Sequence, residues 1–566
     1  MKSISYLDMV KEILNESEFL QFEKCYNNPV RKSIKILNHR GYKNNKSDLH
    51  NIICSTISNQ RDLSEPDFSY NSNKYNDVLF ATRKENLKPA SLWSHFLHQA
   101  WLIYVQEMAA SLSVQMLGIQ EWDYVLDMCA APWGKSIQIA DNLMWGKPPF
   151  GKGGAEWNEA EGYNNSLNIP PTPLNKGGNP KDGGIMPLAK GGQKIWFLIS
   201  NEIDSWRKKA LEANLHRCGI FNVWVINQDW CVIWNKFPET FDKVLVDAPC
   251  SWEGMQYKSD KKIRQRDEKK SKKLSELQIQ LLISWLKSLK VWGELVYSTC
   301  TTNVLENEYV VSEVLKEYWD KIELLPVPLD EKSDWICIWR GNEILSAENA
   351  KKVARFRPHI HWTGGFFIAK FRKFFSIQSV SRHLEWNERS IGVEWISHIR
   401  SKWQNTQDSS ANASEWQIRE KLSIRWISTT PDLDFFISKY TVNIAPKSLI
   451  QSHFENKIPN IEIWLPIFKI LEDKKNNSQK LIPLVWIAQI FGHLATQNVL
   501  EINDKQLKLL MKKRDLNDEK LKDFEWNFVI LKWNGVWVWL VSVQKGIWKN
   551  KIGRAHVWTP VTSLSR

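Results

Sequence analysis

The chain has 566 residues, of which 43% are hydrophobic and 25% are charged, and its formal net charge at pH 7 is +13. This profile is typical of three or four globular domains and excludes a disordered chain. No apolar run reaches the roughly 18 residues of a membrane span, and the first residues contain no signal-peptide core. We therefore expect a cytoplasmic protein with no membrane partner, and the positive charge favours an anionic partner such as nucleic acid.

Residues 1–90 are predicted to form a separate N-terminal domain. A helix is expected from Tyr6 to Glu23, and a basic stretch follows. Residues 24–46 contain seven Lys or Arg and no acidic residue, interleaved with apolar side chains. This pattern fits contact with phosphate groups, although an ordinary solvated surface would have the same composition.

From residue 91 to residue 373 the pattern changes to strands that alternate with helices. The first expected element is a helix from Leu97 to Leu117. Strands are predicted at 124–126, 195–199, 223–226, 244–246, 295–297 and 366–369, and helices at 135–143, 206–218, 274–289 and 306–318. Such alternation indicates an α/β domain with a mostly parallel sheet and helices on both faces.

One segment of this domain does not follow the alternation. Residues 147–193 are rich in Gly, Pro, Lys and Asn, and they contain PFGKGG, PLNKGG and PLAKGG. No predicted strand precedes these glycines and no helix follows in register, which argues against a phosphate-binding loop. We interpret the segment as a flexible low-complexity insertion.

Changes in composition divide the chain after residue 373 into a linker, a compact region and a short C-terminal segment. Residues 374–419 are predicted to be a linker, and a compact region of mixed strands and helices is expected over 420–551. Within it, FVILKWNGVWVWLVSVQKGIWKNK is typical of two or three short strands joined by turns. Residues 552–566 resemble the translation of a sequencing adapter and are excluded from the fold.

Tryptophan is unusually frequent and occupies unusual positions. The chain contains 31 Trp and 25 Gly, whereas average usage near 7% would give roughly 40 glycines. Trp122, Trp230 and Trp292 fall in polar turns, where glycine is the usual residue. In the adapter frame, a UGA codon falls at Trp558. We infer that the source organism reads UGA as glycine and that many of these tryptophans are glycines in the natural protein; UGG codons at 101, 133, 252 and 292 would contradict this.

Residues 125–136 form the turn around which the domain is organised. A short apolar run ends in Asp127, small residues follow, and a helix begins near Lys135. Three more acidic residues follow successive predicted strands, namely Glu202, Asp229 and Asp247. Because ligands of parallel sheets bind beyond the carboxyl ends of the strands, this pattern predicts a nucleoside-type cofactor. A P-loop is excluded, because Cys129 replaces its first glycine and Pro132 lacks an N–H for phosphate.

Two cysteines follow the next two strands and are expected at the same edge of the sheet. Cys250 lies in Asp-Ala-Pro-Cys and Cys300 in Ser-Thr-Cys-Thr. A cysteine beside a carboxylate at a strand end indicates nucleophilic catalysis, whereas isolated cysteines such as Cys218 and Cys337 are typical of packing. No CxxC pair or His/Cys spacing suits zinc, so no metal is expected.

At this point the sequence resembles a known family. The segments 125–136, DAPCSWEGM (247–255), LVYSTCTTNVLENE (295–308) and GGFFIAK (364–370) are similar to the motifs of the NOL/NOP/Sun family, RsmB/RsmF type, of RNA (cytosine-5)-methyltransferases. The resemblance covers about 85–373, and it departs from the motifs APGGK and APCSGEG at Trp133 and Trp252, both in place of glycine. It implies a Rossmann-like class I methyltransferase domain with a mostly parallel seven-stranded sheet, an N-terminal α+β RNA-binding domain over residues 1–90, and a PUA-like C-terminal domain.

The resemblance also implies a role for each site residue. S-adenosylmethionine is the implied cofactor, with Asp127 in its site and Glu202 and Asp229 at its ribose and adenine. Cys300 would attack C6 of a flipped-out cytosine, Cys250 would assist product release, and Asp247 would lie between the cofactor and the base. The methionine part of the cofactor would be wrapped by Cys129, Ala130, Ala131, Pro132, Trp133, Gly134 and Lys135.

Several alternatives remain open at this point. The implied partner is RNA, with ribosomal RNA favoured over transfer RNA, and the protein is expected to act as a monomer. A DNA cytosine-5 methyltransferase would use Cys250 as the nucleophile. A third alternative is a catalytically inactive RNA-binding or assembly factor. This alternative gains weight if Trp133 and Trp252 are genuine, because two indoles would crowd the cofactor turn and the catalytic loop. The basic run 261–273, with eight Lys or Arg and two acidic residues, is expected either to contact RNA or to form a solvated helix start.

Overall fold

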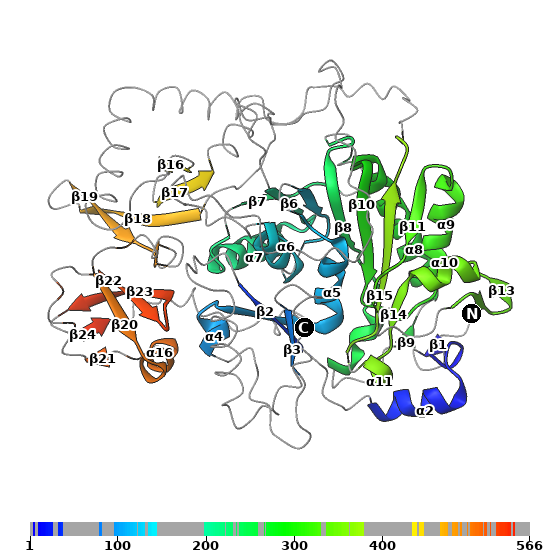
Figure 1. Ribbon diagram of the computed structural model, residues 1–566, viewed down its shortest axis with the longest axis horizontal. Coiled ribbons are helices and arrows are strands. Elements are labelled where there is room, and N and C mark those ends of the chain that lie inside the picture. The colour runs from blue at the N-terminus through cyan, green and yellow to red at the C-terminus, as the bar shows by residue number, and fades with distance from the viewer. Residues whose placement is uncertain are drawn as a thin grey trace, which may run out of the picture.

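A mixed sheet organises the centre of the molecule (Figure 1). In this computed structural model, the described residues comprise most of 96–377 outside 144–196, with shorter stretches between 4 and 81 and between 433 and 549. The strand order is β11-β15-β10-β8-β5-β6-β7, and β14 pairs with β15 off this path. The bounds are β5 Tyr124–Asp127, β6 Phe197–Asn201, β7 Val223–Ile226, β8 Phe241–Asp247, β10 Leu289–Thr299, β11 Ile322–Leu325, β14 Ala354–Phe356 and β15 Phe366–Lys373.

The sheet is mostly parallel, as predicted, but it has eight strands where the sequence predicted seven, because β14 adds to β15. Strands β7, β6, β5, β8 and β10 pair in parallel, whereas β15 pairs antiparallel with β10, β11 and β14. All six strands predicted from the sequence are present. The sequence reading missed β11 and β14, which are short antiparallel additions at one edge.

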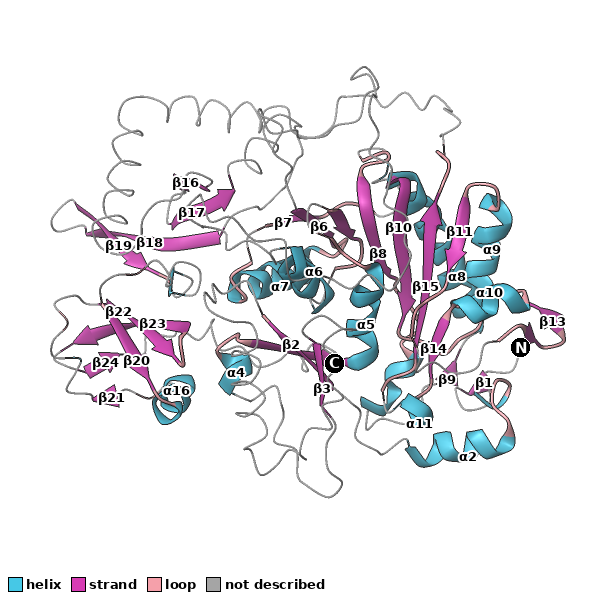
Figure 2. Cartoon of the chain, viewed as in Figure 1, coloured by secondary structure: helices cyan, strands magenta, loops and turns pink. Residues whose placement is uncertain are grey.

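Helices cover both faces of the sheet (Figure 2). Successive strand residues point to opposite faces, so Val125 packs in one core with α5, α6 and α7, while Leu126 packs in the other with α8, α9 and α10. The helices predicted at 135–143, 206–218 and 306–318 are confirmed closely, whereas the one predicted at 274–289 begins earlier, at Glu268. Their bounds are α5 Met108–Leu117, α6 Gly134–Leu143, α7 Ser205–Arg217, α8 Glu268–Ser288, α9 Glu308–Tyr318 and α10 Ala347–Lys352.

The single helix predicted over 97–117 is wrong. The structure divides this stretch into α4 (Phe96–Gln99), strand β4 (Ile103–Glu107) and α5. The buried β-branched residues Ile103 and Val105 favour a strand. Strand β4 pairs with β2 (Lys32–Ile36), which also pairs with β3 (Val78–Ala81). The N-terminal sheet therefore continues past the boundary that we predicted at residues 90/91.

The remaining N-terminal elements lie against the central α/β domain. Helix α2 (Glu16–Cys25) begins later than predicted, and it contacts α11 (Pro358–His361). Strand β1 (Ile4–Ser5) pairs with β9 (Gln265–Arg266). Smaller elements are η3 Glu253–Lys258, β12 Ile338–Trp339 and β13 Asn342–Glu343.

The described C-terminal residues form two further sheets. One has the order β16-β17-β18-β19 and the other β20-β22-β23-β24-β21. The expected short strands near the C-terminus are confirmed as β22, β23 and β24. The bounds are β16 Leu433–Ile437, β17 Thr441–Pro446, β18 Leu465–Asp473, β19 Ser478–Pro483, β20 Val499–Ile502, α16 Asp504–Met511, β21 Leu516–Asn517, β22 Phe528–Trp533, β23 Val536–Gln544 and β24 Ile547–Lys549.

Three predicted segments fall outside the described residues, namely the insertion 147–193, most of the linker 374–419 and the adapter-like end 552–566. Among the helices that the structure describes, none is long and apolar enough to cross a membrane.

Candidate active site

The carboxyl ends of β5, β6, β8 and β10 bring the predicted site residues to one edge of the sheet. Hydrogen bonds join the turn after β5 to its neighbours, because Met128 N–H donates to the Leu245 carbonyl at 3.1 Å and Ala130 N–H to the Asn201 carbonyl at 3.0 Å. Cys129 is buried, and burial raises the pKa of its thiol well above the ordinary value. Ala131, Pro132 and Trp133 lie outside the described residues.

Asp127 is fully buried at the end of β5. Its Oδ2 accepts a hydrogen bond from Ser136 Oγ at 2.6 Å, whereas Oδ1 has no hydrogen-bond partner. Burial raises the pKa of this carboxyl from 3.8 to about 7. Since buried polar atoms are normally hydrogen-bonded, Oδ1 is a position where a ligand could supply the missing partner.

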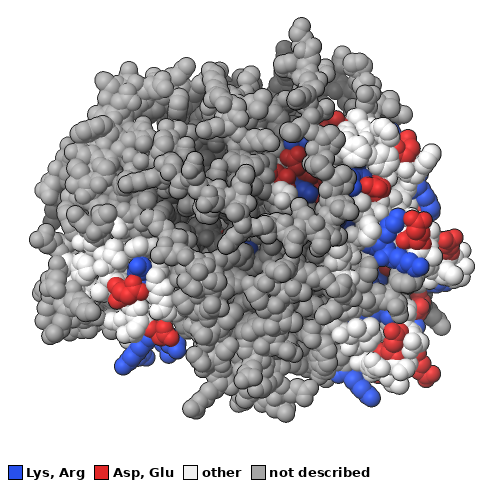
Figure 3. Space-filling model, in the orientation of Figure 1, with Lys and Arg blue, Asp and Glu red and all other residues white. Residues whose placement is uncertain are grey.

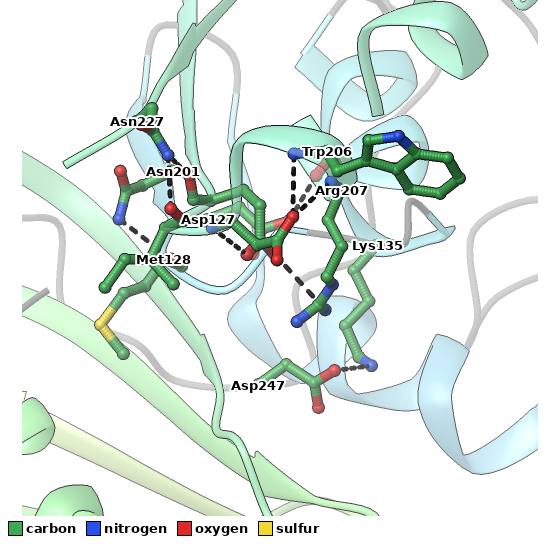
Figure 4. Close-up of polar contacts among 12 residues, drawn as sticks. Asp127, Met128, Lys135, Asn201, Trp206, Arg207, Asn227 and Asp247 are labelled. Atoms are coloured by element: carbon green, nitrogen blue, oxygen red, sulfur yellow. Dashed lines mark hydrogen bonds and ion pairs between the residues drawn. The ribbon is translucent and has the colours of Figure 1, made fainter. Parts of the chain in front are cut away.

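Glu202 follows β6 and is 1% exposed. Its Oε1 accepts the Asp204 N–H at 2.9 Å, and its Oε2 lies 3.4 Å from the guanidinium of Arg207. Asn227 donates to the Glu202 carbonyl at 2.6 Å, which links the ends of β6 and β7; Figure 4 shows Asn227 and Arg207 in this region.

Asp229, the acid expected at the adenine, is exposed beyond the end of β7. The loop that carries it is tied to β6, because Gln228 N–H donates to Asn201 Oδ1 at 3.0 Å and Asn201 Nδ2 donates to the Gln228 carbonyl at 3.2 Å. Asn201 and Asn227 thus shape this end of the sheet. Our sequence reading assigned roles only to the acidic residues and overlooked both amides.

Lys135 joins the cofactor turn to the next predicted site residue (Figure 4). Its Nζ lies 2.6 Å from Asp247 Oδ2, and Ser298 Oγ donates to Asp247 Oδ1 at 2.9 Å. Burial acts to lower the pKa of Lys135, but the Asp247 carboxylate outweighs it and the net shift is upward. Lys135 therefore carries a positive charge in the site, between the turn and Asp247.

Cys250 and Cys300 lie together, as the sequence predicted. Their Sγ atoms are 3.2 Å apart, and both side chains are partly exposed. Burial raises the pKa of the Cys250 thiol well above its ordinary value, with further contributions from Cys300 and Glu306. Cys250 therefore keeps its proton at neutral pH.

Close backbone contacts join the loops that carry the motifs. Gly254 N–H donates to the Cys300 carbonyl and Gly365 N–H to the Gly254 carbonyl, both at 3.0 Å. A Cβ added to Gly254 would lie 1.9 Å from the Gly365 carbonyl oxygen. Only glycine fits at position 254, where the Cys250 loop packs against the backbone of the GGFFIAK segment.

Trp252 does not crowd the catalytic loop as we expected. Its side chain is 56% exposed, and its φ of +61° lies in the left-handed region that favours glycine. The cost of an indole at this position is thus backbone strain.

The described residues contain no cluster of three or more His, Cys, Asp or Glu side chains that could hold a metal ion. The same residues fit S-adenosylmethionine, because the unpartnered Asp127 Oδ1 can accept from an amino group and Glu202 stands where a ribose-binding acid is usual.

Comparison with known proteins gave consistent matches. A family profile described as 16S rRNA methyltransferase RsmB/F matches residues 188–372. Ribosomal RNA small subunit methyltransferase F of Photobacterium profundum is 26% identical over 66% of this chain and 64% of its own length. The protein of that name from Erwinia tasmaniensis is 32% identical over 50% of this chain and 47% of its own length.

A human relative, 28S rRNA (cytosine(4447)-C(5))-methyltransferase, is 31% identical over 48% of this chain. The chain thus spans about half the length of most of the curated relatives it matches, and 27% of the human one. A solved Pyrococcus horikoshii structure described as a methyltransferase homolog is 24% identical, with a TM-score of 0.44, over 63% of this chain and 90% of its own.

Proposed function

Because its central α/β domain belongs to the RsmB/F methyltransferase family, we propose that this protein methylates C5 of a cytosine in RNA, with S-adenosylmethionine as methyl donor. The observation that carries the proposal is the pair of thiols 3.2 Å apart, at the strand edge that also holds Asp127, Lys135 and Asp247. Ribosomal RNA is the proposed substrate, since the relatives named above are ribosomal RNA methyltransferases.

The chemistry of cytosine explains the need for a thiolate. C5 is too weak a nucleophile to take a methyl group directly. The electron pair of the Cys300 thiolate forms a bond to C6, and the C5–C6 π electrons then make C5 nucleophilic. Asp247 stabilises the adduct by a hydrogen bond near N3 of the base, and Lys135 holds Asp247 in place.

Bound S-adenosylmethionine would supply the methyl group as an electrophile. The C5 proton then passes to water, the C5–C6 double bond re-forms, and the bond between C6 and Cys300 breaks, so that the Cys300 sulfur leaves as a thiolate. Cys250 assists this release, consistent with its position 3.2 Å from Cys300. The base must leave any stack to reach these groups, which suits single-stranded or remodelled RNA.

The outer regions complete the proposal. We assign RNA binding to the N-terminal domain around residues 1–90 and to a PUA-like domain over 420–551. Lys35 is an exception within the basic stretch, because it is 1% exposed and bound to Asp141, so it does not contact phosphate. The proposed enzyme acts as a cytoplasmic monomer without a metal, since the thiolate provides the nucleophile.

Two substitutions test the proposal. Cys300→Ala should abolish methylation and covalent RNA adducts, because the nucleophile is lost, whereas Cys250→Ala should accumulate an adduct that survives denaturation. Denaturing gels and transfer of labelled methyl groups to unmodified small-subunit ribosomal RNA measure both outcomes. Cys337→Ala, at a third partly exposed cysteine, is the matched control. Retained activity in Cys300→Ala would reject this mechanism, and an adduct formed through Cys250 instead would indicate the arrangement of a DNA methyltransferase.

A further inference from the structure

A fully buried carboxylate, Glu306, lies between the loops that carry the two cysteines. It is in the turn that precedes α9 and is 0% exposed. Its Oε2 accepts the Ser251 N–H at 2.8 Å and Gln278 Nε2 at 3.3 Å, and its Oε1 accepts Asn303 Nδ2 at 2.8 Å. Burying a carboxylate is costly unless it is hydrogen-bonded in this way, so its position calls for a specific role.

The peptide groups on both sides of Cys250 are fixed by this network. Gln278 Nε2 donates to the Pro249 carbonyl at 2.8 Å, on the N-terminal side of Cys250. Glu306 accepts the N–H of Ser251 on the C-terminal side. Gln278 also donates to Glu306, so the two side chains act as one clamp on the Cys250 loop.

The next residue, Asn307, binds the loop of the other cysteine. Its Nδ2 donates to the Thr301 carbonyl at 3.1 Å, and its Oδ1 accepts Thr299 Oγ1 at 2.6 Å. Asn307 therefore contacts the chain on both sides of Cys300. The Glu306 carbonyl accepts the Tyr297 hydroxyl at 2.6 Å, which anchors this turn to β10.

Two adjacent residues of one turn thus hold two loops that are distant in sequence. We infer that Glu306, together with Gln278, is a positioning residue that places Cys250 against Cys300 and so sets the rate of product release. This inference rests on the proposed function, and it assigns Glu306 to the step in which the product is released. Burial has the largest effect on the pKa of the Cys250 thiol, and the neighbouring Cys300 has the next largest. The Glu306 carboxylate also raises this pKa, and all three effects keep the thiol protonated.

Glu306→Gln tests the inference, because the amide keeps the size of the side chain but must turn its NH₂ toward one of the three donors. In single turnovers on unmodified small-subunit ribosomal RNA, adduct formation should stay within about threefold of the wild type, and adduct decay should slow at least tenfold, about the effect of one lost buried hydrogen bond. Affinity for S-adenosylmethionine should be unchanged. Adding Glu306→Gln to Cys250→Ala should slow decay no further.

Glu212→Gln is the matched control. Glu212 is 8% exposed on α7 and pairs with Lys208, away from both cysteines, so its variant should form and resolve adducts like the wild type. Gln278→Leu is a second test that leaves the carboxylate in place, and it too should slow adduct decay.

The possible failures are distinguishable. If wild-type protein forms no adduct and transfers no methyl group, the proposed function fails and the inference falls with it. If the wild type turns over normally and Glu306→Gln and Gln278→Leu resolve adducts at the wild-type rate, the inference alone is overturned. Equal slowing of both steps, with cofactor affinity intact, also overturns it, because that result indicates general structural support. If Glu306→Gln does not fold, the decay rate of Gln278→Leu decides.

Discussion

At the scale of single residues, three tryptophans have backbone conformations that favour glycine. Trp101, Trp252 and Trp292 have φ values of +57°, +61° and +69°. An L-residue with a side chain pays roughly 1–2 kcal/mol for this conformation, which glycine adopts freely. Composition and motifs of the sequence indicate that many tryptophans here are recoded glycines. The backbone of all three supports it independently.

Trp292 is the sharpest of these positions. It lies where the pairing of β10 with β8 shifts register between Leu289 and Glu294, and its side chain is 56% exposed. A bulge with one residue in the left-handed region is a common place for glycine in a strand. The strain is therefore confined to the backbone, with little packing to lose.

Trp292→Gly should stabilise the protein by about 1 kcal/mol, because strain is removed at a largely exposed position. Urea unfolding of the expressed Trp form and its variant measures the change. Trp319→Gly is the conformational control: Trp319 is 76% exposed at the C-cap of α9, with a right-handed backbone of φ −54°, so the substitution should be neutral or destabilising by up to about 1 kcal/mol. If both variants respond alike, the effect does not come from the left-handed backbone.

At the scale of elements, a buried ion pair joins the N-terminal sheet to the helix of the cofactor turn. Lys35 of β2 lies 3.0 Å from Asp141 of α6, with side chains 1% and 0% exposed. Lys35 Nζ also donates to Asn142 Oδ1 at 3.0 Å. On the adjacent strand, Gln106 donates to Gln138 of the same helix at 2.6 Å. These contacts make β2 and β4 part of the support for α6.

Lys35→Met should destabilise the protein by about 3 kcal/mol, because it leaves the Asp141 carboxylate buried without its partner. The double variant Lys35→Met/Asp141→Leu should recover much of that loss, since an apolar pair has no charge to desolvate. Chemical denaturation of the single and double variants measures both values. Lys316→Met breaks an ion pair with Glu313 whose side chains are 69% and 33% exposed, and it should cost less than about 1 kcal/mol. A double variant no more stable than the single one would contradict the expected electrostatic origin.

At the scale of the whole molecule, net charge turns out to be a weak guide to the site. The chain carries +13 overall, yet basic and acidic side chains are interspersed over the described part of the face in Figure 3. Two lysines near the site already form ion pairs within the protein, since Lys135 pairs with Asp247 and Lys35 with Asp141. For the proposed RNA substrate, affinity should therefore depend on particular basic segments such as 261–273 more than on the overall charge.

The insertion offers a test at the same scale. Deleting residues 149–192 should leave affinity for S-adenosylmethionine within about twofold, a change below 0.5 kcal/mol. The reason is that the described site is built from β5, β6, β8 and β10, and that β5 and β6 pair directly in parallel. Titration calorimetry on the full chain and the deletion variant measures both affinities. A tenfold loss would show that the insertion binds the cofactor or supports its turn.

Local sequence determined the strands and most helices of this protein, and it predicted which side chains meet at one edge of the sheet. Apolar runs of β-branched residues mark buried strands, and acids or cysteines directly after them reach one edge because the strands are parallel. That is why Asp127, Glu202, Asp247, Cys250 and Cys300 could be named in advance. Glycine motifs also carried information, because a backbone as close as that of Gly254 and Gly365 admits no side chain.

Only the tertiary structure decided which side chains support those residues. Glu306, Gln278 and Asn201 bind backbone groups of loops far away in sequence, and no local pattern distinguishes such an amide or acid from a solvated one. Likewise, Lys35 in a basic stretch looked exposed until β2 placed it against Asp141, and β4 looked helical until it paired with β2. Local propensity depends on neighbouring residues, whereas the burial of a charge and the pairing of a strand depend on what the rest of the chain brings to it.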